Sequence, residues 1–401
     1  MTNPTDRIAQ ALWIDTTKDL EKFLDRACLA SEYFMDTEFH REKTYFPQLA
    51  LVQIGVNDEI ALIDPSCLVS GNLARLFEGH GLCVAHAAQQ DLDVLAQSIG
   101  SIPSRLFDTQ LAAGFLGFST PSLVSLLSTY LKVSVPKGDR LTDWLRRPLT
   151  PGQLSYAAGD VAYLPELRQL IVADLEKRSR LAWALEACEE LRIRPTGPIA
   201  PDNAWMRVKD VRTLKGKSRW VARSVARWRE MRAAELDIPV RHVLSDMVIL
   251  GIAAKAPRTE SDLGQTRGID RRQASGATGA SILAAVASGA KDSEQGDLHF
   301  PTPDGDDLDR SLRPAVTLVS AWITELARQQ DLDAVLLGTR QDIVDLLRHA
   351  PSPRLATGWR ADIVGRDVQD LLEGRVGLTF RSAEAGGGLE LQPISGPHHN
   401  T

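Results

Sequence analysis

The chain has 401 residues, which is too long for one ordinary hydrophobic core, so two or three domains are expected. Its content of 43 % hydrophobic and 24 % charged residues is ordinary for a soluble globular protein. The formal net charge of −6 excludes a uniformly basic surface, so any contact with nucleic acid must be local.

The first half of the chain alternates short predicted strands with predicted helices. A helix is predicted over 17–30, where apolar residues recur at helical spacing. The strand patterns are rich in aromatic and β-branched residues and cover 33–39, 49–55, 59–64, 81–87 and 104–110. Helices follow the third and later strands, and the β-β-β-α-β-α-β-α order predicts a mixed sheet with helices on both faces.

The first of these strands, YFMDTEF, carries two acids. Residues two apart on a strand point to the same face, so Asp36 and Glu38 project side by side. Adjacent carboxylates repel each other, and the usual reason for holding them together is a divalent cation such as Mg²⁺ or Mn²⁺. The alternative is a strand whose acids face water, and the pair alone does not decide between the two.

Two later stretches supply further polar groups. Asp91 lies in a predicted helix within VAHAAQQDLDVL. In TPGQLSYAAGDVAYLPEL, Tyr156 and Asp160 are four residues apart and therefore share one face of a helix. The start of that helix is marked by Thr150 as the N-cap and by Gln153, which completes a capping box.

The order of these motifs resembles the DEDD superfamily of 3′→5′ exonucleases, in the subclass with tyrosine in its third motif. The segments around these motifs are similar to those of the ribonuclease D family. They are FMDTEFHREKTYFPQLALVQIG, AHAAQQDLDVL and DRLTDWLRRPLTPGQLSYAAGDVAYLPEL. The five motif positions are all present, and the similarity is strong over residues 1–170 and weaker beyond them. The resemblance implies an α/β ribonuclease-H-like exonuclease domain, which we place at 1–200.

The resemblance also implies a role for each motif residue at a site with two divalent metal ions, Mg²⁺ or Mn²⁺. Asp36 would bridge both ions, Glu38 and Asp160 would complete the first, and Asp91 would support the second. Tyr156 would orient or deprotonate the attacking water, and orientation is the more conservative role because a phenol with a pKa of about 10 is a poor base at neutral pH. The products would be nucleoside 5′-monophosphates, released one at a time from a free 3′ end.

Three other polar residues near these motifs are interpreted as structural. Asp108 precedes an apolar helical run and is predicted to be a helix N-cap. His86 ends a strand near the site and is read as a satisfied, partly buried histidine, because no second histidine nearby offers metal-ligand spacing. Asp93 diverges from Asp91 by about 200° on a helix, so it is placed on a solvated face.

The second half of the chain is predicted to be helical. A Pro- and Gly-rich stretch near 195–203 indicates a domain boundary, and the short helices of 204–292 resemble the HRDC domain, a small nucleic-acid-binding module. An acidic, turn-rich linker is expected over 292–309. Residues 310–380 resemble the second, more divergent HRDC-like domain of the ribonuclease D family. We therefore expect two small all-α HRDC-type domains after the exonuclease domain.

The C-terminal tail, 381–401, is poor in apolar residues and is expected to be disordered. His398 and His399 reflect the composition of this tail rather than a metal site.

A basic segment stands out against the acidic background of the chain. Between Met206 and Arg232 there are ten basic and two acidic residues, a local charge of +8. Four of the basic residues step by four and would lie along one side of a helix, with an apolar face beside them. These four are Lys215, Arg219, Arg223 and Arg227, and we call them the basic stripe. It is predicted to bind phosphate groups, and the alternative is a solvated basic face without a partner.

The expected substrate is RNA with a free 3′ end, with tRNA precursors favoured. Two alternatives are a DNA exonuclease, since the metal chemistry does not distinguish the sugars, and a catalytically dead nucleic-acid-binding module, against which the five intact motif residues argue. Four scattered cysteines without C-x-x-C spacing favour reduced thiols, and no signal peptide or membrane-spanning run is evident. We expect a cytoplasmic monomer with no obligate protein partner.

Overall fold

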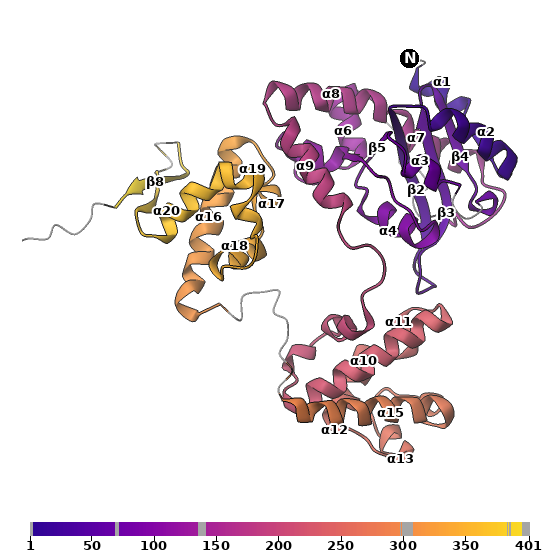
Figure 1. Ribbon diagram of the computed structural model, residues 1–401, viewed down its shortest axis with the longest axis vertical. Coiled ribbons are helices and arrows are strands. Elements are labelled where there is room, and N and C mark those ends of the chain that lie inside the picture. The colour runs from indigo at the N-terminus through magenta and orange to yellow at the C-terminus, as the bar shows by residue number, and fades with distance from the viewer. Residues whose placement is uncertain are drawn as a thin grey trace, which may run out of the picture.

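The computed structural model describes residues 3–68, 72–134, 142–296, 298, 308–382, 384 and 386–394. Figure 1 shows three lobes, one built on a sheet, one around helix α10 (Gly216–Leu236) and one around helix α16 (Arg313–Gln330). Among the described residues, no helix combines the length and the apolarity that a membrane span requires.

The first lobe contains a six-stranded mixed sheet. Its strands are β1 (Leu12–Ile14), β2 (Glu32–His40), β3 (Gln48–Val56), β4 (Glu59–Ile63), β5 (Leu82–Ala85) and β6 (Leu106–Asp108). They lie in the order β1-β4-β3-β2-β5-β6. β2 pairs antiparallel with β3 and parallel with β5, which confirms the predicted mixed sheet. β1 is an addition to the prediction, because three residues are too few to show a period and only pairing with β4 makes them a strand.

Helices cover both faces of this sheet, as predicted. One face packs on α2 (Thr17–Ala27), α3 (Ala74–Phe77) and α4 (Gln89–Ser98). The other face packs on α5 (Thr109–Gly114), α7 (Pro151–Ala162) and α8 (Leu164–Lys177). The remaining elements of the lobe are α1 (Pro4–Ala9), η1 (Pro65–Cys67), α6 (Leu123–Leu126), η2 (Leu127–Leu131) and α9 (Leu181–Arg192). The alternation of β2 sends Phe34 to the α7 side and Met35 to the α4 side.

The predicted caps fix the helices that carry the motif residues. Asp108 accepts hydrogen bonds from the backbone of Gln110 and Leu111, which confirms it as the N-cap of α5. Its other oxygen accepts from Ala88 at 2.8 Å, so the same carboxylate also holds the start of α4. The capping box predicted from Thr150 and Gln153 is present at the start of α7. These caps set where α4 and α7 begin against the sheet.

The second lobe is helical, in agreement with the predicted module. Its elements are η3 (Pro201–Arg207), η4 (Val211–Thr213), α10, α11 (Val240–Val243), α12 (Asp246–Lys255), α13 (Glu260–Gly264), α14 (Arg271–Ala274), α15 (Gly276–Asp292) and η5 (Ser293–Gln295). Its contact with the first lobe is polar and involves the β2–β3 loop. The Tyr45 hydroxyl donates to Glu230 at 2.8 Å, and the Asp237 carboxylate accepts from the backbone of Tyr45 and Phe46.

The third lobe is mainly helical but ends in a hairpin. Its elements are η6 (Arg310–Leu312), α16, α17 (Ala334–Leu337), α18 (Arg340–Leu347), η7 (Arg354–Ala356), α19 (Gly358–Arg360), η8 (Ala361–Gly365), α20 (Arg366–Leu372), β7 (Val376–Phe380) and β8 (Leu389–Pro393).

This hairpin adds two strands that the sequence analysis did not predict, β7 within 310–380 and β8 within the 381–401 tail. Leu389 and Leu391, two apart on β8, pack against the core of the lobe, and pairing with β7 supplies the order that composition did not indicate. His398 and His399 lie outside the described residues.

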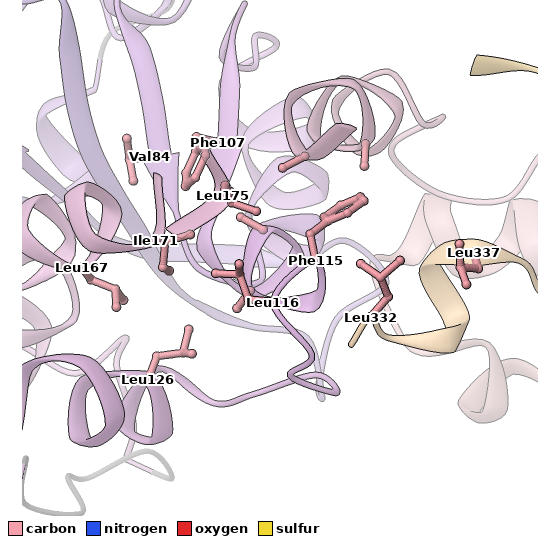
Figure 2. Packing of buried hydrophobic residues seen from close by; sticks show 14 of the residues in the cluster. Val84, Phe107, Phe115, Leu116, Leu126, Leu167, Ile171, Leu175, Leu332 and Leu337 are labelled. Atoms are coloured by element: carbon pink, nitrogen blue, oxygen red, sulfur yellow. The ribbon is translucent and has the colours of Figure 1, made fainter. Parts of the chain in front are cut away.

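The third lobe shares a hydrophobic core with the first. Leu332 lies beside Phe115 and Leu116 of the first lobe in Figure 2, and Leu337 lies beyond it in the same cluster. Trp359 of the third lobe packs edge-on against Phe115, with ring centroids 5.0 Å apart. It also stacks on a tryptophan of α9 at 5.6 Å. The two lobes are therefore joined by apolar burial rather than by surface polar contacts alone.

A buried guanidinium satisfies backbone carbonyls across this junction. Arg180 donates to the carbonyl of Phe115 at 2.8 Å and to those of Gln330 and Asp331 at 2.6 and 3.2 Å. Replacement by an apolar residue would leave those carbonyls without a donor, which costs free energy when they are shielded from water.

We predict that Arg180→Met lowers the free energy of unfolding by about 2–4 kcal/mol, because charged hydrogen bonds to buried carbonyls are lost together. Urea unfolding followed by tryptophan fluorescence measures this change. The matched control is Arg178→Met, whose ion pair with Asp331 is exposed and should be worth at most about 1 kcal/mol. Equal effects of the two substitutions would show that Arg180 does not stabilise the junction.

Candidate active site

Strand β2 and helix α7 bring three carboxylates together. Asp36 and Glu38 project from one face of β2, and Asp160 comes from α7, which covers that face. One oxygen from each of the three carboxylates lies within 4.8 Å of the other two. The prediction that Asp36 and Glu38 share a face is confirmed, and Asp160 joins them from a segment more than a hundred residues away.

Gly55 lies on β3 where the sheet faces α7. Gly55 pairs with Phe34 across β2 and β3. A Cβ atom at this position would lie 3.4 Å from the Phe34 Cβ and 3.9 Å from the Val161 Cβ. These are ordinary van der Waals distances, so a methyl group would fit here and the close packing of α7 beside the carboxylates does not require a glycine.

The electrostatics of the cluster are unfavourable without a cation. Burial raises the pKa of Asp36 well above its usual value, and the charges of Asp91, Asp160 and Glu38 raise it further. Carboxylate oxygens crowded in this way are the ligands that Mg²⁺ and Mn²⁺ prefer. The donor set therefore fits a divalent cation.

Asp91 occupies a separate position beside this cluster. It is buried in the first turn of α4, and its carboxylate accepts a short hydrogen bond from the hydroxyl of Thr37. Burial raises its pKa to about 7, although the bond from Thr37 opposes that shift. Asp91 is not one of the three acids whose oxygens converge, but it is the nearby charge that most affects Asp36.

An open pocket of about 670 Å³ lies over the carboxylates, and Tyr156 and Asp160 line it together. The Tyr156 ring packs against the buried ring of Trp144, with centroids 6.0 Å apart, which fixes the direction of the phenol. Gln90 and Gln110 also line the pocket, and neither was predicted from the sequence. Gln90 precedes Asp91, and that adjacency was the only available signal, whereas nothing near Gln110 in the sequence indicated a site.

His86 is satisfied as interpreted, whereas Asp93 lies outside the acidic pocket as expected but is half-buried rather than on a solvated face. The Nδ1 atom of His86 lies 2.9 Å from the Thr109 hydroxyl, so the ring is satisfied, although it also lines the pocket. Asp93 lines a different cavity, next to Tyr45 of the β2–β3 loop.

The basic stripe lies along α10 but is partly engaged inside its own lobe. Arg219 donates to the carbonyls of Leu214 and Leu298, which gives its guanidinium a structural role. Arg223 and Arg227 approach the Asp202 carboxylate at 3.6 and 3.4 Å. Lys215 precedes the first residue of the helix and is exposed. The binding of phosphate groups by this stripe stays a prediction.

Comparison with known proteins agrees with this architecture. The family model described as a 3′-5′ exonuclease matches residues 11–176, and the HRDC domain model matches residues 218–286. Ribonuclease D of Acidiphilium cryptum is 34 % identical over 392 residues, which cover 94 % of this chain and 97 % of that protein. Ribonuclease D of Jannaschia sp. is also 34 % identical, over 92 % of this chain and 97 % of its own length.

A solved structure extends the likeness to three dimensions. The crystal structure of Escherichia coli RNase D, described as an exoribonuclease involved in structured RNA processing, matches with a TM-score of 0.81 and 27 % identity. The match covers 91 % of this chain and 99 % of that one, so it includes all three lobes. The sheet with its acidic cluster, the HRDC module and this extent of similarity show that the chain belongs to the ribonuclease D family, whose members are metal-dependent 3′-5′ exoribonucleases.

Proposed function

We propose that the chain shortens the 3′ ends of tRNA precursors and other small structured RNAs, one nucleoside 5′-monophosphate at a time. The observation that carries this proposal is the convergence of Asp36, Glu38 and Asp160 in an open pocket that also contains Tyr156. The E. coli relative, described as acting in structured RNA processing, supports the choice of substrate. The four cysteines are unpaired, which favours action in a reducing compartment such as the cytoplasm.

We propose that two divalent ions, Mg²⁺ or Mn²⁺, bind at this site. Asp36, Glu38 and Asp160 would hold them, with Asp91 in support from α4. When bound, such ions activate the attacking water and stabilise the charge on the leaving oxygen.

The side chains then have separate tasks. Tyr156 would orient the attacking water through its hydroxyl, because its ring is held by Trp144 and a phenol is a weak base at neutral pH. Thr37 would fix the direction of the Asp91 carboxylate. The pocket wall, with Gln90 and Gln110, would surround the terminal nucleotide and hold its phosphodiester bond against the acids.

We predict that the protein with Mg²⁺ or Mn²⁺ trims an RNA with a single-stranded 3′ extension faster than a DNA of the same sequence. Asp36→Ala and Asp160→Ala should each abolish activity, because each removes a ligand oxygen. Without metal, their melting temperatures should equal or exceed that of the wild type, because one repelling charge is gone. Gel analysis of oligonucleotide products and calorimetric melting measure the two effects.

The control is Asp93→Ala, which lies outside the pocket and should retain activity. Faster cleavage of DNA would favour the alternative of a DNA exonuclease. A large drop in the melting temperature of the metal-free variants would mean that the acids are structural.

We predict that Tyr156→Phe slows the single-turnover rate on the order of 100-fold, because only the hydroxyl that handles the water is lost. Metal and RNA affinity should stay unchanged. Rapid-quench measurement at saturating enzyme separates the chemical step from binding. The matched control is Tyr130→Phe, whose hydroxyl donates to Asp174 away from the pocket, and it should behave as wild type. A wild-type rate for Tyr156→Phe would leave this side chain with a packing role alone.

For the basic stripe, we propose that three of its members contact RNA phosphates, since Arg219 is engaged with carbonyls of its own lobe. Changing Lys215, Arg223 and Arg227 to Gln should lower the slope of log affinity against log salt by about 2, at roughly 0.7 for each single-strand phosphate. Fluorescence anisotropy with labelled RNA measures the slope. The control changes the exposed Lys18, Lys22 and Arg26 of the first lobe to Gln. An equal fall of the slope in both triple variants would remove any special role of the stripe.

A further inference from the structure

Gln53 on β3 lies directly opposite Asp36 on β2. The register pairs these two residues across the antiparallel ladder, and it pairs Gln53 with Leu62 on its other side. Directly opposed residues of antiparallel strands project to the same face, with Cβ atoms about 4.5–5.5 Å apart. The side chains of Gln53 and Asp36 therefore start side by side, on the face that α7 covers.

The side chain of Gln53 is fully buried, with an exposed fraction of 0 %. Within the described part of the chain, neither its amide oxygen nor its amide nitrogen has a hydrogen-bond partner. Apart from Asp36, its neighbours along the same face are apolar: Leu51 precedes it by two residues on β3, and Leu62 faces it from β4. A buried amide without a partner is unfavourable, and native proteins keep few of them.

Packing alone does not explain a glutamine at this position. An apolar side chain of the same length would fill the space without the cost of desolvating an amide. Residues that lower stability in this way are found where function requires them. The only titratable side chain directly opposite Gln53 in the register is Asp36.

We propose that Gln53 is a positioning residue for the acidic cluster. Its amide N–H donates a hydrogen bond to the ionised Asp36 carboxylate when that carboxylate holds a divalent cation, and the bond fixes the direction of the carboxylate. A carboxylate accepts at two oxygens with about four lone-pair sites, so one amide donor leaves the other sites for cations. This inference rests on the proposed role of Asp36 as a metal ligand.

The proposal explains why an orphaned amide is kept. A hydrogen bond from outside the ligand set to a ligating carboxylate holds it in the direction that binding requires, and loss of such a bond typically costs 10–100-fold in metal affinity. In the protein without metal, the same amide has no partner and lowers stability. Gln53 should therefore affect metal binding and metal-free stability in opposite directions.

The test is Gln53→Met, which keeps the length of the side chain and removes the amide. Mn²⁺ affinity, measured by titration calorimetry with the metal alone, should fall 10–100-fold. The melting temperature without metal should equal or exceed that of the wild type by a few degrees. The single-turnover rate on RNA should fall at low Mn²⁺ and recover substantially when the metal is raised.

Controls distinguish this inference from the proposed function. Gln48→Met changes an exposed glutamine on the same strand and should alter neither metal affinity nor melting. Asp36→Ala should abolish binding at the shared site. If Asp36→Ala binds Mn²⁺ like the wild type, the metal site itself fails. If Asp36→Ala loses binding but Gln53→Met retains wild-type affinity, only the role of Gln53 fails.

A second variant, Gln53→Leu, guards against a packing defect specific to methionine. A fall in metal-free melting temperature in both variants would show that the amide stabilises the fold, and the inference would be overturned. A gain or no change in melting temperature together with weaker Mn²⁺ binding in either folded variant would support it.

Discussion

Repulsion among carboxylates is the constraint on which the first lobe depends. Asp36, Glu38 and Asp160 hold oxygens within 4.8 Å of one another, and burial together with the neighbouring carboxylate charges raises the pKa of Asp36. Only rigid elements on both sides can hold such a cluster without metal. Strand β2 is central in the sheet, and α7 begins at a capping box. The segment before α7 is tied down by Arg147, which donates to the carbonyls of Ala50 and Trp144 at 2.7 Å.

The other two lobes join this frame by different kinds of contact. The third lobe shares a continuous apolar core with it, including the contact of Trp359 with Phe115. The second lobe, which contains the HRDC module, contacts the first lobe through polar contacts of Glu230 and Asp237 with the β2–β3 loop. Apolar cores resist displacement more than small polar interfaces do. We therefore expect the third lobe to move together with the first lobe, and the second lobe to be the more easily displaced from it. The second lobe contacts the β2–β3 loop, which follows Glu38 in the sequence.

Local patterns predicted the parts of the site that depend on local geometry. Alternation along 33–39 placed Asp36 and Glu38 on one face, and the capping box located the start of α7. What escaped prediction depends on partners distant in sequence. The three residues of β1 are a strand only through β4, and β8 is ordered by β7. Arg219 was predicted to be available for phosphate groups on a helical face. Its partners are instead backbone carbonyls, which no pattern of side chains reveals. The family resemblance supplied the roles, which the residues alone left open.

Both faces of β2 contribute to the environment of Asp36. Thr37 points away from Asp36 and Glu38, toward α4, where its hydroxyl binds Asp91. Asp91 therefore acts on Asp36 by its charge from outside the convergent set. The pKa of Asp91 in the folded protein is raised to about 7, so the metal-free fold favours the protonated form of this side chain. The stability that the protonated form contributes is lost as the pH rises through about 7. A cation at the cluster would favour the ionised acids instead, so its binding would release protons and relieve the repulsion among the carboxylates.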